Sequence, residues 1–102
     1  MPEHFNKLTP AEHERLSLLF EEASEVIQVV GKIMRHGFDS CHPDGGPSNR
    51  QLLEKELGDL QFAKNLSTEA GDLNTDRIEQ AEYEKQLNVA KYLHHNKHLL
   101  EE

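Results

Sequence analysis

Three features of the sequence predict an all-α fold. Apolar residues recur at three- and four-residue steps along much of the chain, which is the period of an amphipathic helix. Helix-start signals precede three of these stretches, and no alternating strand pattern of useful length appears. We expect an antiparallel bundle of three to four helices. Because 102 residues with 35% hydrophobic content bury only a modest core, we also expect oligomerisation to complete it.

The first helix is predicted over residues 10–36. Thr9 stands at the N-cap, Pro10 occupies the first helical position, and Glu12 completes a capping box three residues after the cap. Gly37 then favours termination, and the segment that follows is too rich in glycine and proline for a regular element.

Two further helices are predicted downstream, and the chain as a whole is expected to form a single domain over residues 1–102. The second helix covers about residues 48–70, where Ser48 and Gln51 form a weaker capping box. The third covers about residues 75–95, with Thr75 as its predicted cap and a thinner apolar stripe.

Composition limits the classes of function. The chain has 11 basic and 19 acidic residues, a net charge of −8, and a mean hydropathy of −0.77. This balance argues against binding a nucleic-acid duplex, which would require a basic surface. The single cysteine, Cys41, excludes an internal disulfide. No apolar run is long enough to span a membrane and the N-terminus does not resemble a signal peptide, so we expect a cytoplasmic protein with no membrane partner.

Two acidic pairs stand at helical spacing, Glu22 with Glu25 and Glu56 with Asp59. Residues three apart lie on one side of a helix, so each pair can act together. Apolar residues bracket both pairs in the same stripe: Leu18 and Val29 around the first, Leu52 and Ala63 around the second. This pattern predicts carboxylates that are carried towards the interior of the fold.

Helical packing would bring the two acidic pairs together. The apolar face of the first helix centres near Leu19, Ala23 and Val30, and that of the second near Leu53, Leu57 and Leu60. Antiparallel packing through these faces places the acidic flanks in register. Four carboxylates in one pocket repel unless a cation lies between them, and oxygen ligands favour Mg²⁺, with Mn²⁺ as a substitute. Gly58, a costly residue inside a helix, suggests that a backbone or ligand comes close there.

The motif Glu21-Glu22-Ala23-Ser24-Glu25, followed by a helix that bears Glu56-Leu57-Gly58-Asp59, resembles the MazG-like all-α nucleoside triphosphate pyrophosphohydrolases. The resemblance covers roughly residues 10–70. It implies that Glu22, Glu25, Glu56 and Asp59 bind Mg²⁺, and that Glu21 or Glu25 orients or deprotonates the attacking water. The segment between the motifs is on the long side for the family.

The same resemblance implies the reaction. A nucleoside triphosphate, expected to be a deoxynucleotide, would be cleaved between its α- and β-phosphates to a monophosphate and pyrophosphate. Two-metal chemistry suits such a reaction. A homodimer or homotetramer is expected.

A triphosphate needs positive charge beyond the metal ions, and several residues near the acidic motifs could supply it. Those closest to the loop end the first helix or begin the second, and others lie downstream. The candidates for substrate binding are Arg35, His36, Asn49, Arg50, Lys64, Lys85 and Lys91.

Other interpretations remain open. A non-catalytic helical interaction protein or regulatory dimer would share the helices and the acidic surface. A related hydrolase of nucleoside diphosphates or phosphorylated metabolites would share the metal site. A zinc site at His94, His95 and His98 has the helical spacing for chelation but lacks a completing ligand.

Overall fold

A computed structural model of the protein describes residues 5–100. Regular structure in this range is helical: α1 (Pro10–His36), α2 (Asn49–Glu69), α3 (Thr75–Val89) and two short 3₁₀ helices, η1 (Ala90–Tyr92) and η2 (Lys97–Leu100). The chain divides into two compact units, Met1–Asp72 and Leu73–Glu102. The predicted all-α class is confirmed, whereas the single domain and the completed bundle stay predictions.

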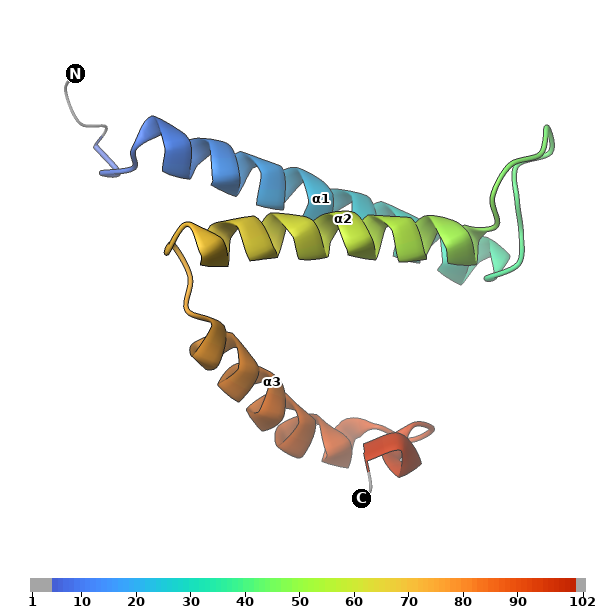
Figure 1. Ribbon diagram of the computed structural model, residues 1–102. Coiled ribbons are helices and arrows are strands. Elements are labelled where there is room, and N and C mark those ends of the chain that lie inside the picture. The colour runs from blue at the N-terminus through green and yellow to red at the C-terminus, as the bar shows by residue number, and fades with distance from the viewer. Residues whose placement is uncertain (1–4, 101–102) are drawn as a thin grey trace. The chain divides into compact units, whose positions relative to one another are not determined.

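The first unit is an antiparallel pair of long helices. α1 and α2 pack along their lengths and are joined by the loop at residues 37–48, as Figure 1 shows. The loop has little regular structure. It contains one isolated antiparallel β-bridge, between Cys41 and Ser48. Because the loop reverses the chain, residues in the middle of α1 come to lie beside residues in the middle of α2.

Local signals in the sequence fix where α1 and α2 begin. Thr9 Oγ1 accepts a hydrogen bond from the Glu12 backbone N–H, and the Glu12 carboxylate accepts one from the Thr9 N–H. Ser48 and Gln51 form the equivalent reciprocal pair at α2. Each capping box satisfies N–H groups that have no partner inside the helix, so both starts follow directly from the sequence.

Buried side chains are few between residues 5 and 100. Ala63 is the one buried hydrophobic residue there, and Asn49 and Ser67 are the buried polar ones. The rest of the contact between α1 and α2 consists of half-buried side chains. A helix pair with so little buried apolar surface is only marginally stabilised by the hydrophobic effect.

The second unit differs from the sequence prediction in two details. Asn74, not Thr75, caps α3, because the Asn74 side-chain oxygen accepts a hydrogen bond from the Arg77 N–H at 3.0 Å. The α-helix also ends at Val89 rather than near residue 95. The residues beyond Val89 are mostly polar, so they have no apolar stripe that would keep them helical.

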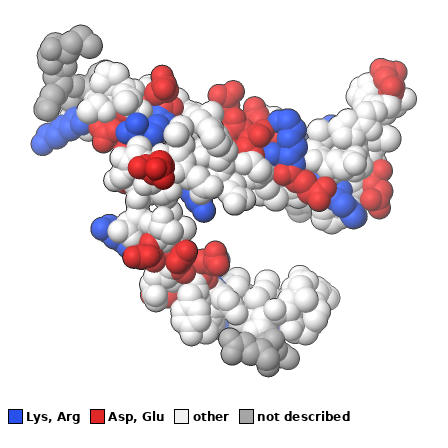
Figure 2. All heavy atoms as spheres, in the orientation of Figure 1, with Lys and Arg blue, Asp and Glu red and all other residues white. Residues whose placement is uncertain are grey.

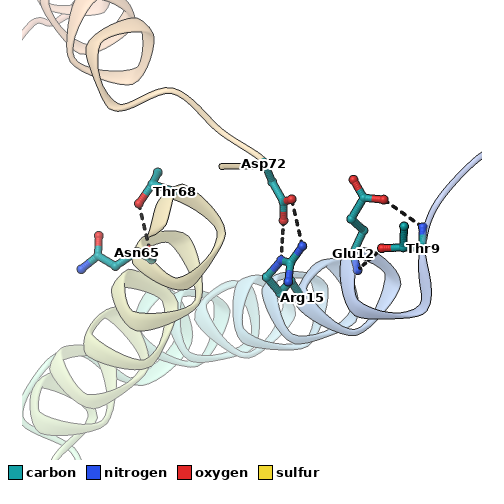
Figure 3. A network of polar contacts seen from close by, with 6 residues as sticks. All are labelled: Thr9, Glu12, Arg15, Asn65, Thr68 and Asp72. Atoms are coloured by element: carbon teal, nitrogen blue, oxygen red, sulfur yellow. Dashed lines mark hydrogen bonds and ion pairs between the residues drawn. The ribbon is translucent and has the colours of Figure 1, made fainter. Parts of the chain in front are cut away.

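An ion pair connects the first turns of α1 with the chain just after the end of α2. The Arg15 guanidinium on α1 donates to both carboxylate oxygens of Asp72, at 2.6 Å and 3.0 Å, beside the Thr9–Glu12 cap, as Figure 3 shows. Asp72 follows Gly71, whose positive φ of 86° turns the chain after α2. The hydrogen bonds from Arg15 lower the pKa of Asp72.

We predict that Asp72→Asn destabilises the protein at neutral pH but not in acid. The lowered pKa of Asp72 contributes stability above its unfolded value, near 3.9, and that contribution disappears as the pH falls through the folded pKa. Urea unfolding of the variant and of the wild type should therefore give midpoints that differ at neutral pH and converge as the pH falls through the lowered pKa of Asp72 in the folded state. Equal midpoints at neutral pH would show that the ion pair adds nothing.

Candidate metal centre

Four carboxylates from two helices form one cluster. Glu22 and Glu25 come from α1, Glu56 and Asp59 from α2, and each offers an oxygen within 4.8 Å of the others. All four side chains are half-buried. The acidic quartet is therefore brought together as the sequence predicted, across the contact between the two helices.

The quartet contains oxygen atoms without partners. Among the described side chains, three buried polar atoms make no hydrogen bond: Glu22 Oε2, Glu56 Oε2 and Ser67 Oγ. Two of these three belong to the quartet. Because a buried carboxylate oxygen without a hydrogen bond is costly, a cation is the natural group to satisfy both atoms. Oxygen-only donors at this spacing suit a hard divalent cation such as Mg²⁺ or Mn²⁺.

A hydrogen bond and the neighbouring negative charges perturb the pKa of Glu25 within the quartet. A hydrogen bond with Glu56 and the negative charge of Glu56 raise the pKa of Glu25 to about 7. Desolvation and the charges of Glu22 and Glu21 act in the same direction. Without a cation, Glu25 thus keeps its proton up to near neutral pH, whereas a bound cation would displace it.

Lys55 supplies a positive charge that the sequence analysis did not anticipate. Its Nζ atom lies 2.7 Å from Asp59 Oδ2 and 3.6 Å from Glu56 Oε1. The hydrogen bond with Asp59 raises the pKa of Lys55. The four-residue spacing of Lys55 and Asp59 on one helix was the available signal. Lys55 neutralises the α2 side of the quartet and leaves the α1 carboxylates without a matching cation.

Two residues singled out from the sequence lie outside the quartet. Glu21 is exposed on α1, one turn before Glu25, and its charge still contributes to the raised pKa of Glu25. Gly58 is also exposed, and a Cβ atom added there would meet nothing within 4 Å. Within the described residues, therefore, no close backbone approach explains the glycine.

The candidate substrate-binding residues near the loop have different environments. Arg35 and His36 are exposed at the end of α1. Arg50 is exposed, lies over the Phe38 ring at 4.8 Å, and pairs with Asp39 at 3.4 Å. These positions leave the two guanidinium groups and the imidazole of His36 accessible to an anionic ligand.

Asn49 has a different environment from its neighbours in the sequence. It is only 2% exposed, and its side-chain amide donates to the Gly37 carbonyl at 3.0 Å. Its backbone N–H donates to the Ser40 carbonyl at 2.8 Å. Through these hydrogen bonds, Asn49 at the start of α2 holds the beginning of the loop beside its end.

The remaining candidates are on α2 and in the second unit. Lys64 is half-buried on α2, after Asp59. Lys85 is exposed on α3, and Lys91 in η1 lies 5.2 Å from the Tyr92 ring. His94, His95 and His98 follow the end of α3, so the helical spacing that a zinc site would use is not present.

Charge on the first unit is mixed rather than of one sign. Figure 2 shows acidic and basic side chains interspersed along α1 and α2 on the face that it presents, with no broad basic patch there. No helix in the described part of the chain has the length and apolar character needed to cross a lipid bilayer.

Comparisons with protein-family models, with curated proteins and with solved structures found no match.

We predict that the metal-free protein loses stability as the pH rises from about 4.5 to about 7, because the folded state retains a proton on Glu25 that the unfolded state releases. Glu25→Gln should remove this decline. Urea unfolding midpoints in EDTA at about pH 5 and about pH 8 measure it for the wild type and the variant.

Glu54→Gln is the matched control for this experiment, because Glu54 is an exposed acid on α2 outside the quartet. It should keep the decline of the wild type. A Glu25→Gln variant that also kept it would contradict the assigned pKa and its cause.

Proposed function

We propose that the protein is a Mg²⁺-dependent nucleoside triphosphate pyrophosphohydrolase. The acidic quartet with its two unpartnered oxygens carries this proposal, because it offers a cation a set of oxygen ligands on two rigid helices. The resemblance of the two acidic motifs to the MazG-like family supplies the reaction. Mn²⁺ should substitute for Mg²⁺, since both accept oxygen ligands.

The reaction transfers the α-phosphoryl group of the nucleotide to water. The water oxygen forms a bond to the α-phosphorus while the bond to the bridging oxygen of the β-phosphate breaks, which releases pyrophosphate and a nucleoside monophosphate. When bound, the metal ions would neutralise phosphate charge and lower the pKa of water. Glu22, Glu56 and Asp59 would hold the ions, together with Glu25.

Glu25 and Glu21 are the candidates to accept the proton of the attacking water. Glu25 belongs to the quartet, so its carboxylate would lie beside a water molecule held by the metal ions and could accept the proton of that water. Glu21 lies one helical turn away and is exposed, so it can reach a water molecule at the edge of the quartet.

Cations at the loop end of the helix pair suit the phosphates of the substrate. Arg35 and Arg50 are both exposed there, and an arginine can bind a phosphate with two parallel hydrogen bonds. Lys55 offers a further ammonium group beside Asp59, available once a metal ion replaces it as the counter-charge. We propose a deoxynucleoside triphosphate as substrate and a homodimer or homotetramer as the active form.

We predict metal-dependent release of pyrophosphate from one or two deoxynucleoside triphosphates. Glu25→Gln should lower turnover by about 10²–10⁴-fold through loss of the proton acceptor. The assay compares a panel of ribo- and deoxynucleotides in Mg²⁺ and in EDTA, with product analysis and with Glu54→Gln as a control that retains activity.

Each other outcome points to a different function. Release of orthophosphate from diphosphates or phosphorylated metabolites would identify a related hydrolase. A folded protein that releases nothing from any nucleotide in Mg²⁺ would contradict the proposal and favour the helical interaction protein.

A further inference from the structure

α1 carries a second apolar stripe that α2 does not cover. Large side chains on this stripe are exposed, from 39% for Val30 to 83% for Met34. The side chains that pack towards α2, such as Leu18, Val26 and Val29, lie elsewhere on the helix and are half-buried. We define the seam as this stripe, whose small member Ala23 is half-buried and whose large members are exposed: Leu16, Phe20, Ala23, Ile27, Val30 and Met34.

The spacing along the seam is that of a coiled coil. Its members follow one another at steps of four, three, four, three and four residues, which is a heptad repeat of a and d positions. At 100° per residue they fall within an arc of about 80°. A strict seam of this kind is typical of a surface that packs against another helix.

We propose that the seam binds the same seam of a second copy of this chain, with the two α1 helices antiparallel about a two-fold axis near the level of residue 25. The order of steps reads the same from either end, so antiparallel pairing aligns every layer. Leu16 then faces Met34 of the second copy, Phe20 faces Val30, and Ala23 faces Ile27. Each layer combines two different side chains.

Packing favours antiparallel over parallel pairing. In the antiparallel arrangement the small Ala23 side chain faces the larger Ile27, and Phe20 faces the smaller Val30. In a parallel arrangement each residue would face its own copy, so two alanines would meet in one layer and two phenylalanines in another, and the layers would fill unevenly.

Small residues beside the seam leave room for a close approach. Ser17, Ser24 and Gly31 line one flank of the seam at seven-residue intervals. A Cβ atom at Gly31 would meet only the Arg35 guanidinium, at 3.6 Å, so packing within the described residues does not require a glycine. A glycine in a helix interior is otherwise unfavourable, and a neighbouring helix that crosses here would explain it.

A hollow lies at the N-terminal end of the seam, where the second copy would place Met34. Its volume is about 390 Å³, and a flexible methionine side chain suits such an irregular space. Its lining residues are Asn6, Leu8, His13, Leu16, Ser17 and Phe20.

The area of the seam fits a dimer. Its five large side chains, at their exposed fractions, present about 600 Å² of surface, and a standard interface uses about 800 Å² per partner. The apolar residues of α3 make a poorer match. Ile78 and Leu87 lie on opposite sides of that helix, so it has no stripe that could fill the seam.

Light scattering on the 102-residue chain, coupled to gel filtration, tests whether this surface mediates association. The wild type should have at least twice the 11.7 kDa mass of one chain. Ile27→Asp should weaken association by at least about a hundredfold, because each dimer would then contain one charge in each of two apolar layers. Phe62→Asp is the matched control: Phe62 is 61% exposed on α2, outside the seam, and the variant should associate like the wild type.

Cross-linking tests the orientation without a charged substitution. In a Cys41→Ser background, a mixture of Leu16→Cys and Met34→Cys chains should form a disulfide between copies, whereas either chain alone should not. Copies of residue 16 would be about 27 Å apart along the axis, well beyond the reach of a disulfide.

Three results would overturn the inference: a monomeric wild type, an Ile27→Asp variant that associates normally, or cross-linking of either cysteine chain alone. A wild-type tetramer that Ile27→Asp reduces to dimers would support it. The inference does not rest on the proposed enzymatic activity, so an inactive protein could still pair through the seam.

Discussion

The repulsion among four carboxylates at the contact between α1 and α2 is the constraint on which the rest of the structure depends. The helices meet where Glu22, Glu25, Glu56 and Asp59 offer oxygens within 4.8 Å of one another, and Ala63 is the one buried apolar residue that the described range contains. So small an apolar contact cannot readily offset several uncompensated charges. The proton on Glu25 and the ammonium group of Lys55 reduce the repulsion in part. A divalent cation would reduce it further, which links metal binding to stability.

α1 presents two different faces, one acidic and one apolar. Glu25 lies on the side of the helix opposite the seam, so self-association through the seam leaves the acidic quartet accessible. The same helix can therefore hold a metal site on one side and a subunit contact on the other. This division explains why a chain that buries so little by itself is rich in apolar residues along α1.

Local features of the fold could be predicted from the sequence, and features that depend on tertiary packing could not. The capping boxes at Thr9 and Ser48 involve neighbouring residues, so their positions were correct. The acidic quartet was also predicted correctly, because its spacing on each helix and the reversal of the chain are enough to assemble it. Asn74 was overlooked beside Thr75, although asparagine is at least as good a cap.

The apolar face of α1 shows the limit of periodicity. Averaging over the helix gave one broad face centred near Leu19 and Val30, but Val30 belongs to the exposed seam and Val29 to the half-buried side towards α2. Two stripes were thus merged into one. The hydrogen bond by which Asn49 holds the loop closed was missed for a related reason. Its partner, the carbonyl of Gly37, comes near only once the loop has folded back.

Titration calorimetry with Mg²⁺ on the purified 102-residue chain tests the central claim most directly. The account predicts saturable binding that Glu22→Gln and Glu56→Gln each weaken strongly, while Glu54→Gln, outside the quartet, leaves it unchanged. Binding near neutral pH should also release a proton, because the pKa of Glu25 is raised to about 7. No binding to the folded wild type, or equal binding by all three variants, would contradict the assignment of the quartet as a metal site.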